Sequence, residues 1–329
     1  EIGVRLVGSE MCIRDRQIVG GFCILNALIP ICSSYLRAFG FSKEPLYASI
    51  IGNVINFCLN AFFLFVLHKG VAGVATATVI SRIINLVIVV LLGAVLVKAK
   101  QHPERESNRA VMGQIIRIGL PSACETAIYN VSMTLVIRFL NQMDAQGLNV
   151  TARSYTMQIT NFSYCVGAAL AQANAIMTGW HIGAKEYDAC DRGTKKAAVI
   201  GVIVAVILET VFTLCSGWIM QLFSKDPQMV SLVGKLLAID IVLEIGRVTN
   251  LVYGQALKTS GDAVFPVVMG VCFMMLCSVG GTYLFGIRLG LLAVGAYIGM
   301  AGDECVRAIG MYLRWKSGKW KEKGLIKSR

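Results

Sequence analysis

Long apolar stretches separated by short polar loops dominate the chain. A transmembrane helix needs about 20 predominantly apolar residues. Stretches of that kind lie at 18–38, 46–67, 71–97, 115–140, 148–178, 197–223, 229–256, 264–286 and 290–313. The pattern predicts nine membrane-spanning helices, and therefore an all-α polytopic membrane protein. Composition agrees, because 56% of the 329 residues are hydrophobic and only 15% are charged, which excludes disordered and ordinary water-soluble proteins.

Basic residues are distributed unevenly among the predicted loops. The loops of one side carry 19 Lys and Arg residues, whereas those of the other side carry only Lys69, Lys225 and Arg288. The positive-inside rule places the basic side in the cytoplasm, including the polar segment 98–114 and the basic tail 316–329. The net charge of +12 then reflects the membrane surface and does not indicate nucleic-acid binding. Trp315 and Trp320 in this region predict anchoring at the membrane interface.

A short pattern occurs twice along the chain. A leucine, a basic residue, a glycine and a proline have identical spacing in Leu36, Arg37, Gly40 and Pro45 and, 221 residues later, in Leu257, Lys258, Gly261 and Pro266. Farther on, Gly70 and Val74 match Gly290 and Val294 at an offset of 220. Both copies lie on the predicted cytoplasmic side, six spans apart. An even number of helices between copies predicts a parallel repeat of six helices.

This repeat predicts a twelve-helix protein made of two lobes. Residues 17–97 would belong to a partial first lobe, with three more helices expected before it. Residues 98–114 would link it to a complete second lobe at 115–315. Residues 1–16 are excluded from the fold, because six of them are charged and their ending GSEMCIRDR resembles translated sequencing-adaptor text.

Glu125 is a candidate coupling residue within the fourth apolar stretch. It follows Pro121, which weakens the local helix, and Tyr129 and Met133 share its helix face. A lone carboxyl in a low-dielectric cavity can gain and lose a proton near neutral pH. The sequence therefore predicts a proton-coupling acid at Glu125, and the alternative is a carboxyl that is hydrogen-bonded to a neighbouring helix.

A second polar stripe combines Asp240, Glu244, Arg247 and Asn250, at spacings of one helical turn. One interpretation is a charge cluster that faces a cavity, with Asp240 or Glu244 able to bind a proton or cation. The alternative is a neutralised network that holds helices together. Both interpretations remain open at this stage.

Other polar residues within the apolar stretches have weaker patterns. Gln158 and Asn161 are candidate cavity or substrate residues, while Asp303 and Arg307 are predicted to form a structural pair at i,i+4. Glu209 is isolated in its stretch, and Arg138 and Arg153 are predicted to extend toward the membrane surface, or else to make a cavity mouth basic. Helix-packing hydrogen bonds are the favoured interpretation of the stripe formed by Ser49, Asn53, Asn56 and Asn60.

Motifs typical of nucleotide-dependent or metal-dependent catalysis are absent from the sequence. There is no GxxxxGK[ST] loop, so ATP binding through a P-loop is not expected. HExxH and GxSxG motifs are absent as well. His68, His102 and His181 are isolated, and they predict no metal cluster. No cofactor is expected, and an enzyme is not the favoured class.

Several segments resemble the multidrug and toxic compound extrusion (MATE) family. LRAFG, NVINFCLN and GVAGVATATVISR look like spans four to six of that family. IGLPSACETAIYN and IGAKEYDACDRG look like spans seven and eight, and EIGRVTNLVYGQALKTSGDAVFP resembles span ten with the loop after it. The resemblance covers Gln17 to Trp315.

The resemblance implies a twelve-helix, two-lobed antiporter of a bacterial inner membrane. Such proteins export cationic or amphipathic drugs in exchange for protons or sodium ions. Glu125 matches the acid after the GLP motif in one bacterial subgroup, while other members carry this acid one turn later, where Tyr129 stands. The span-ten acid of sodium-coupled members corresponds to Arg247, which argues against sodium coupling through that position. A lipid-linked saccharide flippase and a membrane-embedded enzyme are the alternatives.

Overall fold

The structure, a computed structural model, describes residues 20–98, 108–144 and 147–323, and within these ranges it is helical with no strand. The adaptor-like segment 1–16 lies outside the described residues. The contacts divide the chain into two units, Glu1–Arg105 and Glu106–Arg329. The predicted all-α fold is therefore confirmed for the described residues.

The described residues of the first unit form three long helices. They are α2 (Ile24–Ala38), α3 (Lys43–Ala61), which continues as the π-helical η1 (Phe62–Val66), and α4 (Gly70–Lys98). The asparagine stripe of α3 faces α4, where Asn56 donates to the Ser81 hydroxyl at 3.1 Å and accepts from Asn60 at 3.0 Å. These bonds support the interpretation of the stripe as helix-packing contacts.

The second unit is a larger helical bundle. Its elements are α5 (Asn108–Met143), α6 (Leu148–Gly183), α7 (Tyr187–Leu214), α8 (Ser216–Met220), α9 (Pro227–Thr259), α10 (Val264–Phe273), η2 (Met274–Val279), η3 (Thr282–Arg288), α11 (Leu292–Lys316) and η4 (Lys319–Glu322). Helix α5 begins at Asn108, so the later part of the predicted linker 98–114 is helical, and its residues 99–107 lie outside the described residues.

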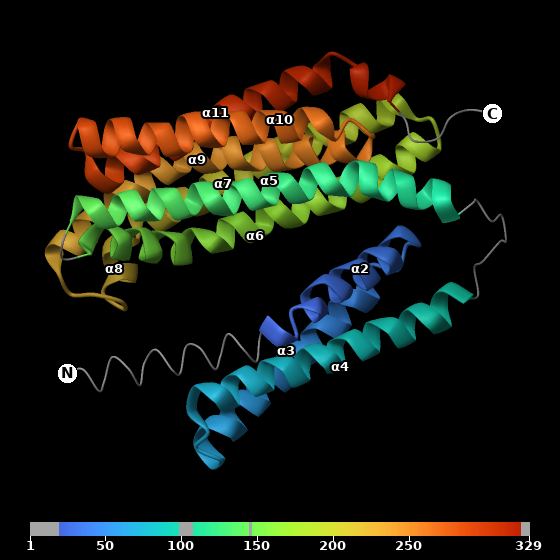
Figure 1. Ribbon diagram of the computed structural model, residues 1–329, viewed down its shortest axis with the longest axis horizontal. Coiled ribbons are helices and arrows are strands. Elements are labelled where there is room, and N and C mark those ends of the chain that lie inside the picture. Colours follow the sequence, from blue (N-terminus) through green and yellow to red (C-terminus); the bar gives the residue numbers. More distant parts are fainter. Residues whose placement is uncertain (1–19, 99–107, 145–146, 324–329) are drawn as a thin grey trace. The chain divides into compact units, whose positions relative to one another are not determined.

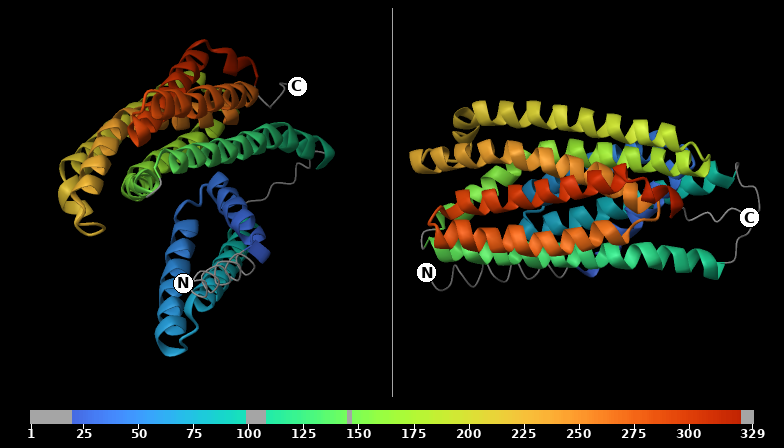
Figure 2. Two further views of the ribbon diagram at one scale, coloured as in Figure 1. Left: turned by 60° about the vertical axis from the view of Figure 1, so that its left-hand side comes forward. Right: turned by 90° about the horizontal axis from the view of Figure 1, so that it is seen from above.

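Helix α9 is central in this second unit. It packs against α6, α7 and α11, and these long helices run alongside one another (Figures 1 and 2). Its start is encoded locally, because the Asp226 carboxylate accepts the backbone N–H of Gln228 at 3.0 Å and Pro227 occupies the first helical turn. Because α9 packs against α6, α7 and α11, its polar stripe lies in the middle of the bundle.

Four helices in the described residues are long and apolar enough to cross a membrane by length and composition. They are Lys43–Val66, Gly70–Val97, Tyr187–Leu214 and Val264–Arg288. Four other long helices, α5, α6, α9 and α11, also coincide with predicted spans but carry more polar side chains. All four of these polar helices contribute to the cavity described below.

The internal repeat is visible in the backbone. Gly40 and Gly261 have φ angles of +90° and +92°, and each follows the end of a helix. The backbone N–H of Phe41 donates to the carbonyl of Leu36 at 3.0 Å, and the N–H of Asp262 donates in the same way to the carbonyl of Leu257 at 2.9 Å. Glycine adopts this left-handed conformation without steric cost, which explains its presence at both turns.

The register of the second part of the repeat differs from the sequence prediction. Positive φ angles occur at His68 and Gly70, +47° and +55°, and at Gly290 and Leu292, +68° and +53°. Gly70 thus corresponds to Leu292, at an offset of 222, and pairing it with Gly290 was wrong. The second copy contains the additional π-helical segment η2, and a π-helical turn holds more residues than an α-helical turn.

Two tryptophans close the end of the second unit at which α11 terminates. Trp315 and Trp320 are each only 1% exposed and stack with ring centroids 4.2 Å apart. The Trp315 indole N–H donates to Asp191 at 2.9 Å, and that of Trp320 donates to the Trp315 carbonyl at 3.0 Å. The predicted role as interfacial anchors is therefore wrong, because both rings lie inside the protein.

Asp262 forms ion pairs that connect three segments at the same end of the unit. Its carboxylate accepts from Arg314 at 2.6 Å and from Lys323 at 2.7 Å. Burial alone would raise the pKa of Asp262, but the hydrogen bonds and positive charges of Arg314 and Lys323 outweigh burial and hold this pKa below its usual value. The loop after α9 is thereby fastened to α11 and to the segment that follows it.

Candidate functional site

A cavity of about 480 Å³ lies within the second unit. Residues of α5, α6, α9, α10, η2 and α11 line it. Methionines, tyrosines and charged groups all contribute to its wall. In the described residues the wall carries four carboxylates and four basic groups: Glu125, Asp240, Asp303 and Glu304, then Arg153, Arg247, Lys258 and Arg307. Formal charges on the wall therefore balance.

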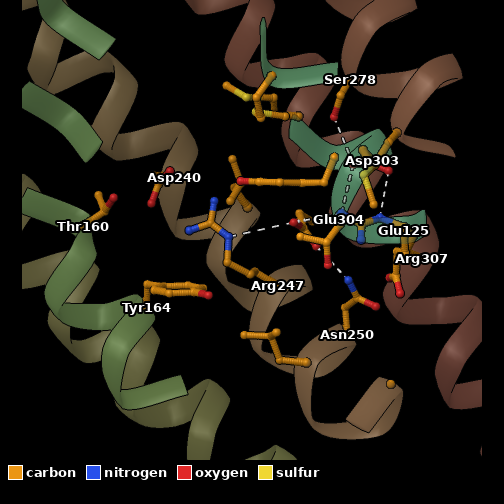
Figure 3. Close-up of a pocket in the computed structure, with 18 of the residues that line it drawn as sticks. Glu125, Thr160, Tyr164, Asp240, Arg247, Asn250, Ser278, Asp303, Glu304 and Arg307 are labelled. Atoms are coloured by element: carbon orange, nitrogen blue, oxygen red, sulfur yellow. Dashed lines mark hydrogen bonds and ion pairs between the residues drawn. The ribbon is translucent and has the colours of Figure 1, made fainter. Parts of the chain in front are cut away.

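The predicted pair of Asp303 and Arg307 is one edge of a buried network. Arg307 donates to both oxygens of Asp303 at 2.9 and 3.0 Å and contacts Glu304 at 2.9 Å (Figure 3). Asp303 also accepts from the Ser278 hydroxyl at 2.9 Å. Two hydrogen bonds between one guanidinium and one carboxylate fix both side chains in orientation.

Helix α9 extends this network. The side-chain amide of Asn250 donates to the Glu304 carboxylate at 3.0 Å, and the Arg247 guanidinium lies 3.9 Å from the same carboxylate. Arg247 also pairs with Glu244 at 2.7 Å. Its guanidinium lies 5.9 Å from the centroid of the Tyr164 ring (Figure 3). Glu244 is completely buried and is not among the lining residues, so at this position the structure favours the alternative of a neutralised network that holds helices together.

Glu125 has an ion-pair partner. Its carboxylate lies 2.6 Å from the ammonium of Lys258, which is 133 residues away in the sequence. The prediction of a lone carboxyl is therefore wrong, and the alternative of a bond to a neighbouring helix is correct. Lys258 could have been found from the sequence, since it continues the stripe of α9 one turn after Gly254.

Asp240 differs from the other carboxylates of the wall. In the described part of the chain it forms no ion pair, and its Oδ2 is buried without a hydrogen-bond partner. Tyr129, Met133 and Asn161 line the cavity as their helix faces predicted, whereas Gln158 is exposed and is not a lining residue. The candidate role of Gln158 in binding substrate stays a prediction, which this cavity does not support.

Arg153 lies deep in the bundle. The residue lines the cavity and is only 7% exposed, and its guanidinium contacts the Met133 sulfur at 3.6 Å. Extension toward the membrane surface is therefore wrong for Arg153. Arg138, which received the same prediction, is exposed and is not a lining residue.

Glu209 of α7 is completely buried behind the cavity. Neither carboxylate oxygen has a hydrogen-bond partner among the described residues. Asp240, Glu244 and Arg247 lie within electrostatic range of it, and the Ser163 hydroxyl is close by. An isolated acid in an apolar helix was the sequence signal, but its surroundings depend on helix packing.

We expect the substitution Glu209→Met to stabilise the protein by about 1 to 3 kcal/mol, the usual cost of a buried polar group without partners. Methionine has a similar length and needs no hydrogen bond, and the substitution also removes an acid close to Asp240 and Glu244. Thermal unfolding of the detergent-solubilised protein, followed by circular dichroism, measures the change.

Glu244→Met is the matched control for this prediction. Glu244 is equally buried but is paired with Arg247, so its removal should lower the melting temperature. A fall in melting temperature for Glu209→Met, as large as that for Glu244→Met, would show that Glu209 has a stabilising partner.

Histidines contribute little to this region. The Nδ1 atom of His181, near the end of α6, lies 2.9 Å from the carboxylate of Glu186, which follows that helix. His102 lies outside the described residues. Among the residues that the structure describes, no group of three or more His, Cys, Asp or Glu side chains could hold a metal ion.

A family model and solved structures match this chain. The family model named MatE matches residues 121–284. A crystal structure of "MATE in the straight conformation" superimposes with a TM-score of 0.79 at 19% identity, and the match covers 95% of this chain and 71% of that chain. At this level of identity the likeness shows the fold.

Two curated proteins of Bacillus subtilis (strain 168) are also similar. The uncharacterized transporter YisQ is 34% identical over 315 residues, which cover 94% of this chain and 69% of YisQ. The probable multidrug resistance protein YoeA is 22% identical over 309 residues, which cover 90% of this chain and 65% of YoeA. The chain thus spans about two thirds of the length of these relatives.

Proposed function

This chain belongs to the MATE family of membrane transporters, and from that premise we propose that the protein is an antiporter that exports amphipathic, drug-like compounds from bacterial cells. Protons or sodium ions would drive export across the inner (plasma) membrane, with residues 98–114 and the C-terminal tail in the cytoplasm. The name of YoeA, a probable multidrug resistance protein, supports this substrate class.

The cavity of mixed polarity is the observation that carries this proposal. Methionine side chains adapt to ligands of different shape, and tyrosines contribute large apolar surfaces with a polar end. Tyr129, Tyr164 and Tyr297 line the cavity together with Met133, Met157, Met274, Met300 and Met311. Such a wall suits amphipathic molecules better than strongly hydrated ones.

Coupling requires a group on the wall that can exchange a proton or a cation. Of the predicted candidates, Glu125 and Glu244 would each have to give up an ion pair, with Lys258 and Arg247 respectively. Asp240 has no such pair in the described residues. We therefore favour Asp240 as the coupling residue, because proton uptake there changes the charge of the cavity without breaking a contact.

Transport by the whole protein in liposomes tests this proposal. With a fluorescent drug-like dye and an imposed pH gradient, wild type should move the dye, and Asp240→Asn should fall to the level of protein-free liposomes. Asp226→Asn is the matched control, since Asp226 is exposed and asparagine also caps a helix well. Unchanged pH-driven transport by Asp240→Asn would remove Asp240 from the mechanism, and replacing the pH gradient by a sodium gradient distinguishes the two ions.

Two alternatives have less support. A flippase for lipid-linked saccharides would need an excess of basic groups to bind pyrophosphate, whereas the carboxylates and basic groups of this wall balance. A membrane-embedded enzyme would need a catalytic constellation, whereas three of the four basic groups on the wall, Arg247, Lys258 and Arg307, are held in ion pairs. Transport remains the function that the cavity supports best.

A further inference from the structure

Arg153 is exceptional among the basic residues of the cavity wall. Arg247, Lys258 and Arg307 each pair with a carboxylate at 2.9 Å or less. Arg153 forms no ion pair with any described residue, and its Nε is buried without a hydrogen-bond partner. More than nine-tenths of the residue is buried, yet it lines the cavity.

A buried guanidinium without an anionic partner is energetically costly. Arginine does not lose its proton inside proteins, so the charge of Arg153 persists. Its planar array of N–H donors matches carboxylate, sulfonate and phosphate groups. An anion that enters the cavity would therefore supply the partner that the protein itself does not provide.

One hydroxyl group is placed to assist Arg153. Tyr297 of α11 lines the cavity, lies within electrostatic range of both Arg153 and Asp240, and has the Thr156 hydroxyl close to it. The Tyr297 hydroxyl can donate a hydrogen bond to an acidic group bound at Arg153. Thr160 lies two helical turns, about 10 Å, farther along α6 on the same cavity wall, so it would contact a different part of such a ligand.

Asp240 provides an opposite charge on the same wall, within electrostatic range of Arg247 and Tyr297. It is the wall carboxylate that has no ion pair in the described residues, and Figure 3 shows it across from Thr160. The wall therefore presents one unmatched positive charge and one unmatched negative charge. Every other charged group on the wall already has an internal partner.

We propose that the cavity binds amphipathic zwitterions, and that Arg153 recognises their acidic group while the amine lies near Asp240. The apolar body of the ligand would contact the methionines and tyrosines of the wall. This inference rests on the proposed function, since it names the substrate class of the same cavity. Arg153 is then the residue that distinguishes acidic ligands from purely cationic ones.

Two dansyl compounds that differ by one carboxylate test this assignment. Dansylcadaverine carries an amine, whereas Nε-dansyl-lysine carries the amine and a carboxylate on a chain of the same length. Equilibrium binding to the whole protein in nanodiscs, followed by dansyl fluorescence, needs no ion gradient. Wild type should bind dansyl-lysine about 10- to 100-fold more tightly, the effect of one charge-assisted contact.

Arg153→Gln should reduce this preference to about one without weakening the binding of dansylcadaverine, because the contact with the carboxylate is lost. Arg153→Lys keeps the charge and should retain part of the preference, which separates recognition from misfolding. Arg138→Gln is the matched control, since Arg138 is exposed and lies off the wall, and it should preserve the wild-type ratio.

Either of two results would overturn the inference: equal binding of both compounds by wild type, or an unchanged preference in Arg153→Gln. These results are independent of transport, because no gradient is applied. A protein that binds dansyl-lysine through Arg153 but moves no dye would contradict the antiporter proposal alone. Conversely, gradient-driven export without a preference for the zwitterion would contradict only the role of Arg153.

Discussion

Arg307→Gln is expected to lower the free energy of unfolding by about 3 to 5 kcal/mol, the usual cost of removing one partner from a buried ion pair. Arg307 is 5% exposed and holds Asp303 and Glu304 through contacts of 2.9 to 3.0 Å. Glutamine is too short and carries no charge, so two carboxylates would be left beside each other. Thermal unfolding of the detergent-solubilised protein measures the loss.

A second substitution distinguishes lost charge balance from lost packing. Adding Asp303→Asn to Arg307→Gln removes one of the two carboxylates that lost their partner, and it should recover part of the lost free energy of unfolding. Arg288→Gln is the control, because Arg288 is exposed and contacts only the Tyr283 ring and hydroxyl in the described residues. A loss below about 1 kcal/mol for Arg307→Gln, as for an exposed arginine, would contradict the buried network.

Gly295→Ala should destabilise the protein by about 3 kcal/mol or more, at the upper end of the cost of overpacking. A Cβ at Gly295 would lie 2.4 Å from the Phe285 carbonyl carbon and 2.5 Å from the Gly286 nitrogen. Both are backbone atoms, so no side-chain rotation relieves the clash. Gly295 and Gly299 form the GxxxG pattern through which α11 approaches η3, as is common between membrane helices.

Gly302→Ala on the same helix is the matched control. No atom lies within 4 Å of a Cβ built there, so alanine should be neutral or stabilise the helix by up to about 1 kcal/mol. Both variants can be compared by the temperature at which the monodisperse peak disappears in size-exclusion chromatography. Equal melting temperatures for the two variants would show that η3 can move away from α11.

Helix positions and part of the cavity were predictable from the sequence because they depend on local periodicity. Asp240, Arg247 and Asn250 share one face of a helix whatever that helix packs against, and the structure places all three on the cavity wall. The same argument places Tyr129 and Met133 beside Glu125. Gln158 shows its limit, because the side of a helix that faces a cavity depends on its neighbours.

Contacts between distant segments were not predictable from one sequence. Lys258 and Glu125 are 133 residues apart, and Trp315 and Asp191 are 124 apart. No periodic pattern connects such positions, since each pattern describes one helix only. A basic residue or a tryptophan near a helix end is typical of the membrane surface. The sequence therefore predicted surface positions for Arg153 and Trp320, and the structure buries both.

By itself the sequence determined that this protein is a bundle of apolar helices with a repeated turn, because chain length, hydropathy and the left-handed glycines Gly40 and Gly261 act locally. Only the tertiary structure decided which charges remain unmatched. Pairing a charge depends on distances between side chains of different helices, and those distances exist only after the helices have packed. Asp240 and Arg153 became the leading candidates for this reason, and Glu125 did not.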